Sequence, residues 1–205
     1  MHQVTDSGAV TDIRAPASRP RVVIVGGGFG GVAAVRALKH CNADVVLIDR
    51  RNHHIFQPLL YQVATAVLAP SEVAAPLRQL AQQQPNLSVL MAEVTNIDLA
   101  TKQVTASPPG LPPRTLFFDF LVVATGAHPT YFGHDEFAAY APSLKTLTDA
   151  EAIRTRILSA YELAEQTDDP GTAQSGNDFR LGRRRPDRGR AGGIASANGP
   201  YHAAL

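Results

Sequence analysis

A short run of glycines between a strand and a helix constrains the fold more than any other feature of this chain. Residues 22–25 are four apolar residues, β-branched and too few for a helix, so they predict a buried strand. Gly26, Gly28 and Gly31 follow directly in the spacing G-x-G-x-x-G, and an alanine-rich run then predicts a helix. A second β-branched run ends on Asp49 and predicts a strand parallel to the first. The order of these elements predicts a βαβ unit.

In this context the glycines are typical of a site for a dinucleotide pyrophosphate. Gly26 permits the tight turn, Gly28 lets the backbone approach the pyrophosphate, and Gly31 allows close packing of helix on strand. The start of the helix that follows offers free N–H groups and the positive end of the helix dipole, which favour an anion.

Asp49 stands at the tip of the second predicted strand, where its carboxylate can accept hydrogen bonds from ribose hydroxyls. The alternative is an exposed strand-end residue paired with Arg50 or Arg51, and one of these arginines is a candidate for a phosphate or adenine contact. The motif does not separate NAD from FAD, because both carry adenosine diphosphate. A plain NAD-dependent dehydrogenase therefore stays open at this point.

Composition limits the remaining possibilities. With 205 residues, 44% of them hydrophobic, and a net charge of +1, the chain is long enough for one full domain and part of a second. We expect residues 1–20 to form a flexible N-terminal arm without a secretory signal, and no apolar run is long enough to span a membrane. The single Cys41 excludes a two-cysteine redox centre, and His53 and His54 lack the further ligands of a metal site.

The middle of the chain predicts a helix and then a series of strands. The helix opens at Pro70 with Ser71 as its N-cap and continues to residue 82. A strand over 87–94 follows. Shorter strands with turn residues between them then indicate an antiparallel meander inserted into a parallel sheet, over 94–99, 103–106 and 115–118.

Residues 120–124 predict another buried strand that returns to the parallel sheet. Its break at Thr125 and Gly126 is expected to bring backbone beside a cofactor, at the carboxyl ends of the strands. A capping box over 148–151 predicts a further helix that runs to Glu165. Residues 171–205 then hold seven glycines and six arginines without apolar periodicity, which predicts a basic disordered tail.

Between about Arg21 and Glu165 the chain resembles the type II, single-subunit NADH dehydrogenases. These are FAD-dependent enzymes that pass electrons from NADH to a membrane quinone. The resemblance is carried by five segments: VIVGGGFGG (23–31), DRRNHH (49–54), FQPLLYQVAT (56–65), ATGA (124–127) and YFGHDE (131–136). The second and third are specific to this family, while the first and fourth occur across the wider flavoprotein superfamily.

The resemblance implies an α/β fold, with a Rossmann-like FAD-binding parallel sheet over 21–166 and an irregular tail over 167–205. It implies that the glycine fingerprint holds FAD, that the Val94 backbone lines the adenine pocket, and that Thr125 and Gly126 lie near the flavin. The implied cofactor-binding residues are Gly26, Gly28, Phe29, Gly30, Gly31, Asp49, Arg50, Val94, Ala124, Thr125 and Gly126. No residue is expected to be catalytic or to bind a metal.

The resemblance implies that NADH and a quinone are the substrates of an intact family member. It also implies that such an enzyme lies at the cytoplasmic face of an inner membrane and that it does not bind nucleic acid. The family's second βαβ unit, for NADH, and its C-terminal membrane-binding region do not appear in this sequence. We therefore expect an incomplete FAD-binding domain, with little or no activity of its own. The alternative is a non-catalytic flavin-binding or nucleotide-binding module or a pseudogene product.

The basic tail has a specific interpretation at the level of codons. If each codon from Asp178 to Gly193 is read one base late, with silent third bases chosen freely, the tail becomes TFVLVGGGPTGVELAG. This string resembles the family's NADH fingerprint at its expected place. An inserted base or a sequencing error between Thr167 and Asn177 would explain it.

Overall fold

The computed structural model describes residues 3–4, 10–11 and 19–166, which fall into two compact units. Within the described residues, the first unit holds 3–4, 10–11, 19–60 and 68–129, and the second holds 61–67 and 130–166. The predicted tail over 167–205 and most of the predicted arm over 1–20 lie outside the described residues, so both remain predictions. Each unit is described by itself.

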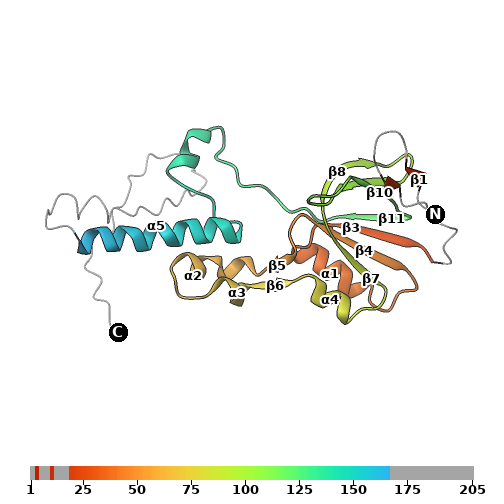
Figure 1. Cartoon of the computed structure of the whole chain (residues 1–205), viewed down its shortest axis with the longest axis horizontal. Helices are drawn as coiled ribbons and strands as arrows, with labels where there is room; N and C mark the ends of the chain where they lie inside the picture. The colour runs from red at the N-terminus through yellow and green to blue at the C-terminus, as the bar shows by residue number, and fades with distance from the viewer. Residues whose placement is uncertain (1–2, 5–9, 12–18, 167–205) are drawn as a thin grey trace, which may run out of the picture. The chain divides into compact units, whose positions relative to one another are not determined.

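A four-stranded parallel sheet is the centre of the first unit (Figure 1). Its order is β11-β3-β4-β7, with every neighbouring pair parallel. The four strands are β3 (Arg21–Val25), β4 (Asp44–Asp49), β7 (Leu87–Met91) and β11 (Phe120–Val123). This arrangement confirms the Rossmann-like α/β fold that the βαβ pattern predicts.

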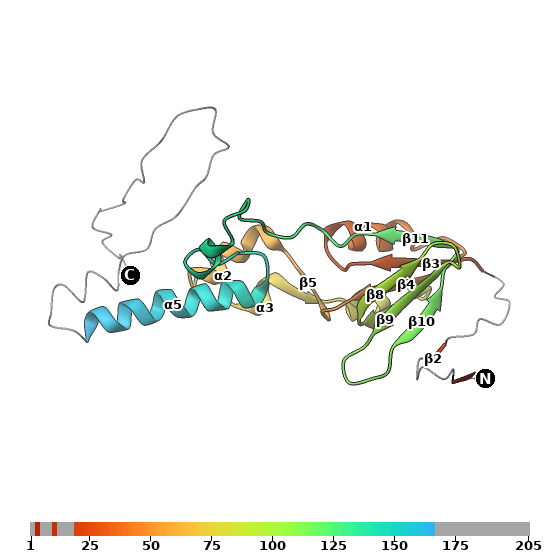
Figure 2. The ribbon, with the colours of Figure 1, turned by 90° about the horizontal axis from the view of Figure 1, so that it is seen from above.

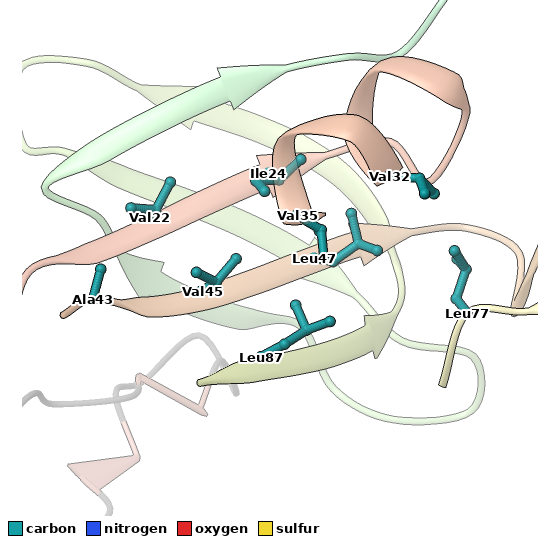
Figure 3. Close-up of a cluster of buried hydrophobic side chains, with 9 residues drawn as sticks. All are labelled: Val22, Ile24, Val32, Val35, Ala43, Val45, Leu47, Leu77 and Leu87. Atoms are coloured by element: carbon teal, nitrogen blue, oxygen red, sulfur yellow. The ribbon is translucent and has the colours of Figure 1, made fainter. Parts of the chain in front are cut away.

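One face of the sheet packs against α1 (Phe29–Ala37) and α4 (Arg78–Gln82). Alternate residues of β3 point to opposite faces, so Val22 and Ile24 join this core while Val23 and Val25 join the other. Figure 3 shows the core on the helix side, with Val35 of α1 lying over the strands. Its buried members are Val22, Ile24, Val32, Val35, Ala43, Val45, Leu47, Leu77 and Leu87.

The opposite face packs against the antiparallel meander, whose strands lie in front of the parallel strands in the view of Figure 2. The meander consists of β8 (Glu93–Asp98), β9 (Gln103–Ser107) and β10 (Arg114–Phe117), as the turn pattern predicts. Two short strands from the predicted N-terminal arm extend it, β1 (Gln3–Val4) and β2 (Val10–Thr11). The two pair antiparallel with each other, and β2 pairs in parallel with β10.

The helix predicted from Pro70 to residue 82 is wrong in its middle. The chain forms α3 (Pro70–Val73), then the strand β6 (Ala74–Pro76), and only then α4. Pro76 has no N–H to give to a helix and disfavours helical geometry in the residue before it, which breaks the pattern. The N-cap is Ala69 rather than Ser71, because proline takes the first helical position, and the Glu72 carboxylate accepts the Ala69 N–H at 2.7 Å.

Two strand predictions also need correction. The strand expected over 87–94 divides at Ala92, where the chain leaves the parallel sheet after a last hydrogen bond from the Ala92 N–H to the Asp49 carbonyl. The strand expected to be buried over 120–124 is largely exposed, with Phe120 at 61% and Val123 at 59%. The reason is position: β11 lies at an edge of the sheet, with β3 as its neighbour.

The second unit contains most of α2 (Leu60–Ala64), the 3₁₀ helix η2 (Asp135–Ala139) and the helix α5 (Leu147–Glu165). α5 ends where expected, but its capping box lies two residues earlier than predicted. Thr146 is the N-cap: its hydroxyl accepts the Asp149 N–H at 3.1 Å, and the Asp149 carboxylate accepts the Thr146 N–H at 2.9 Å. Among the described helices, none has both the length and the apolar character needed to cross a membrane.

Candidate dinucleotide-binding site

The turn between β3 and α1 needs glycine at its two ends. Gly26 has a φ of +106°, a region that residues with a Cβ rarely adopt, and a Cβ there would collide with the Ala124 carbonyl oxygen. A Cβ on Gly31 would overlap the carbonyl oxygen of Gly26. These contacts fit the roles that the spacing predicts for both residues, a tight turn and close packing of helix on strand.

Gly28 differs, because a Cβ placed on it would have no neighbour within 4 Å. Its backbone is extended, with φ −75° and ψ −164°, so the fold itself does not require glycine there. Gly28 is the N-cap of α1, and no side chain caps this helix or places an acid in its first turn. The helix therefore presents uncapped N–H groups and its positive dipole end beside open space, which suits a phosphate.

Asp49 holds the glycine loop in addition to marking the end of β4. One carboxylate oxygen accepts the Gly27 N–H at 2.6 Å, and the other accepts the backbone N–H of Arg51 at 2.7 Å. The contact with Arg51 is thus through the backbone, and it fixes the carboxylate in place. Each oxygen keeps a lone pair for a further donor, such as a ribose hydroxyl.

A pocket of about 250 Å³ opens beside Asp49 at the carboxyl ends of the parallel strands. Pockets for complete small-molecule ligands usually measure about 300–1,000 Å³, so this one suits a part of a dinucleotide rather than the whole. Its walls combine both signs of charge, from two arginines and two acids, with apolar side chains between them. The lining residues are Val25, Gly26, Ile48, Asp49, Arg50, Arg51, Ala92, Glu93, Val94, Thr125 and His128.

Several residues predicted from the sequence come together here. Gly26, Asp49, Arg50, Val94 and Thr125 all line the pocket, although 99 positions separate the first from the last (125 − 26). Ala124 contacts the glycine loop, since its Cβ lies 3.5 Å from where a Cβ of Gly30 would be. Phe29 is the first residue of α1 and is half exposed, while Gly126 has a φ of +73° and does not line this pocket.

The sequence does not single out Glu93 or His128 as pocket residues. Glu93 directly precedes the predicted Val94, and His128 follows Gly126 by two positions, so proximity in sequence was the available signal. His54, which the sequence places in a polar loop, reaches the glycine loop instead, with its Nδ1 atom 3.0 Å from the Gly27 carbonyl oxygen. In residues 19–166 no group of His, Cys, Asp or Glu side chains gathers in the way that a metal ion requires.

Comparison with known families decides what kind of domain carries this site. Residues 20–164 match the family model described as pyridine nucleotide-disulphide oxidoreductase. The chain belongs to this family. The matched domain is the flavin-binding one, so the fingerprint and the pocket lie in the part of the family fold that carries FAD.

Among curated proteins of the family, two relatives are from Mycobacterium tuberculosis. The chain is 48% identical over 155 residues to the type II NADH:quinone oxidoreductase Ndh. This alignment covers 76% of this chain and 33% of Ndh. It is 47% identical over 151 residues to NdhA, also a type II NADH:quinone oxidoreductase. This alignment covers 74% of this chain and 32% of NdhA. The chain therefore spans about one third of the length of these relatives.

Solved structures show the same fold. NDH2 from Plasmodium falciparum, solved in complex with NADH, superposes with a TM-score of 0.66 at 25% identity, over 75% of this chain and 31% of NDH2. The sulfide:quinone oxidoreductase of Aquifex aeolicus superposes with a TM-score of 0.59 at 24% identity, over 70% of this chain and 32% of that enzyme.

Proposed function

We propose that this chain is the FAD-binding portion of a type II NADH:quinone oxidoreductase. The observation that carries the proposal is the coincidence of three features at one place: the open Gly28, the uncapped start of α1, and the pocket beside Asp49. The 48% identity to Ndh supports FAD over other dinucleotides, since the matched region is the flavin-binding one.

Each residue group has a defined task in this proposal. The backbone N–H groups at the start of α1 bind the pyrophosphate, and the Asp49 carboxylate accepts hydrogen bonds from the adenosine ribose. Val94 and Arg50 bound the space for adenine, and Ala124, Thr125 and Gly126 lead towards the flavin. The flavin, when bound, supplies the electron-transfer chemistry, and the protein supplies its placement.

NADH and a quinone are the proposed substrates of the whole enzyme, because the relatives are named for that reaction. A membrane quinone is apolar, so we place the enzyme at a membrane surface. The basic tail is proposed to be an out-of-frame remnant of the NADH-binding unit, because its residues are compatible with codons that, read one base late, encode a second glycine fingerprint. The nucleotide sequence between the codons of Thr167 and Asn177 tests this directly: a gene with no alternative reading frame there contradicts it.

FAD binding by the purified chain tests the central proposal. We expect the protein to be yellow or to take up FAD with the absorbance band of a bound flavin, and NAD not to displace it. Asp49→Ala should weaken FAD binding by about ten-fold or more, because a hydrogen bond to a charged group contributes about 1.5–3 kcal/mol. A folded, colourless protein that takes up no FAD contradicts the proposal, and a preference for NAD supports a plain dehydrogenase instead.

A further inference from the structure

Gly27 is held from two sides by side chains outside the glycine fingerprint. Its N–H donates to Asp49 Oδ2 at 2.6 Å, and its carbonyl oxygen lies 3.0 Å from His54 Nδ1. Leu77 fills a third side, since a Cβ on Gly27 would lie 2.6 Å from its Cδ1 atom. Both peptide groups that flank the Gly27 Cα are therefore fixed by contacts from other elements.

The fold brings His54 to this position through a small two-stranded ribbon. The strand β5 (His53–Ile55) pairs antiparallel with β6, with His54 opposite Ala75, and the Leu77 N–H extends the ribbon by donating to the Asn52 carbonyl at 2.8 Å. The His54 ring also packs edge-on against Phe29, with centroids 5.1 Å apart and an interplanar angle of 89°. Pairing and packing thus aim the ring at the loop.

The contact determines which ring nitrogen carries the proton. The Gly27 carbonyl oxygen can only accept a hydrogen bond, so His54 Nδ1 must be the donor. In neutral His54 this leaves Nε2 as the unprotonated nitrogen. Nδ1 also keeps its proton in the imidazolium form, so the bond does not depend on the charge of the ring.

We propose that His54 is a positioning residue for the pyrophosphate, acting through the peptide between Gly27 and Gly28. In a trans peptide the carbonyl and the following N–H point in opposite directions, so holding the Gly27 carbonyl turns the Gly28 N–H away from His54. Within residues 19–166 no hydrogen bond takes up that N–H. A loop fixed in this way binds an anion without an ordering cost. The inference rests on the proposed function, because it assumes that the loop binds a pyrophosphate.

The tautomer of His54 provides a test that needs no cofactor. Nitrogen NMR of the imidazole in the apo-protein, above the pH at which histidines titrate, distinguishes a proton on Nδ1 from one on Nε2. We expect the Nδ1–H form for His54. A His54 ring in the Nε2–H form overturns the inference, whatever the protein does with FAD.

Binding measurements on three variants test the role itself. His54→Phe keeps the aromatic packing against Phe29 but removes the donor, and should weaken FAD binding by about ten-fold. His54→Asn places an amide N–H near the position of Nδ1 and should stay close to the parent protein. His53→Asn is the matched control: the neighbouring ring contacts Asn52 Oδ1 instead of the loop, so FAD binding should not change.

The outcomes separate this inference from the proposed function. If the parent binds FAD and His54→Phe binds it equally well, His54 does not position the loop. Equal losses in His54→Asn and His54→Phe also contradict the inference, since they indicate a role in packing only. A parent protein that fails to bind FAD overturns the proposed function and with it this role for His54, while the NMR result still decides whether the bond to Gly27 exists.

Discussion

At the scale of single residues, the glycines of the fingerprint have different tasks that mutation can separate. Gly28→Val should leave the apo-protein folded with stability near that of the parent, because the backbone there is extended and the space is open. FAD binding should be abolished, since the new side chain occupies the space that the pyrophosphate needs. Thermal unfolding of the apo-protein and a titration with FAD measure the two effects.

Gly31→Ala is the contrasting variant, although it adds fewer atoms. Its Cβ would overlap the Gly26 carbonyl oxygen, so we expect the fold itself to be destabilised, with a clear fall in the melting temperature. If Gly28→Val unfolds the protein while Gly31→Ala does not, the assignment of the two glycines is reversed.

At the scale of the element, the start of α5 depends on the charge of Asp149. Partial burial of Asp149 acts to raise its pKa, but hydrogen bonds from the Lys145 N–H, the Ser143 hydroxyl and Thr146 outweigh it and hold the pKa below the usual 3.8. A folded pKa below the unfolded one means that the carboxylate stabilises the protein above about pH 4, and that this contribution is lost as the pH falls through the folded pKa.

Asp149→Asn should therefore lower the free energy of unfolding near neutral pH by about 1 kcal/mol and flatten its decline in acid. Urea unfolding from pH 6 down to pH 3, followed by helical circular dichroism, measures both. Glu151→Gln is the control, because Glu151 is exposed and lies in the capping box that the sequence predicts but the structure does not form. If Glu151→Gln lowers the free energy of unfolding more than Asp149→Asn does, the capping box of α5 starts at Thr148 instead of Thr146.

At the scale of the whole molecule, the proposed frame change predicts which activity is absent. The 205-residue chain should show little or no NADH oxidation with a quinone analogue, because Arg190 stands where the shifted frame encodes the fingerprint glutamate. Removing one base between the codons of Thr167 and Asn177 should encode the second fingerprint and allow NADH to bind. Steady-state NADH oxidation by both products decides this, and robust turnover by the unshifted chain contradicts it.

The sequence by itself determines the βαβ unit, the meander and the roles of Gly26 and Gly31. These follow from signals that lie within a few residues of one another: β-branched runs, glycine spacing and turn residues. Asp49 is also identifiable, because it stands at the tip of a predicted strand, whereas Val94 is implied only by the resemblance to the family. Local periodicity was sufficient for these features, since neighbouring residues decide them.

Only the tertiary structure decides the features that depend on distant partners. The pairing of β5 with β6 carries His54 to Gly27, 27 positions away. The exposure of Phe120 follows from the edge position of β11, which its apolar composition does not reveal. Glu93 and His128 line the pocket because the carboxyl ends of parallel strands meet at one edge of the sheet, a proximity set by packing rather than by any local pattern.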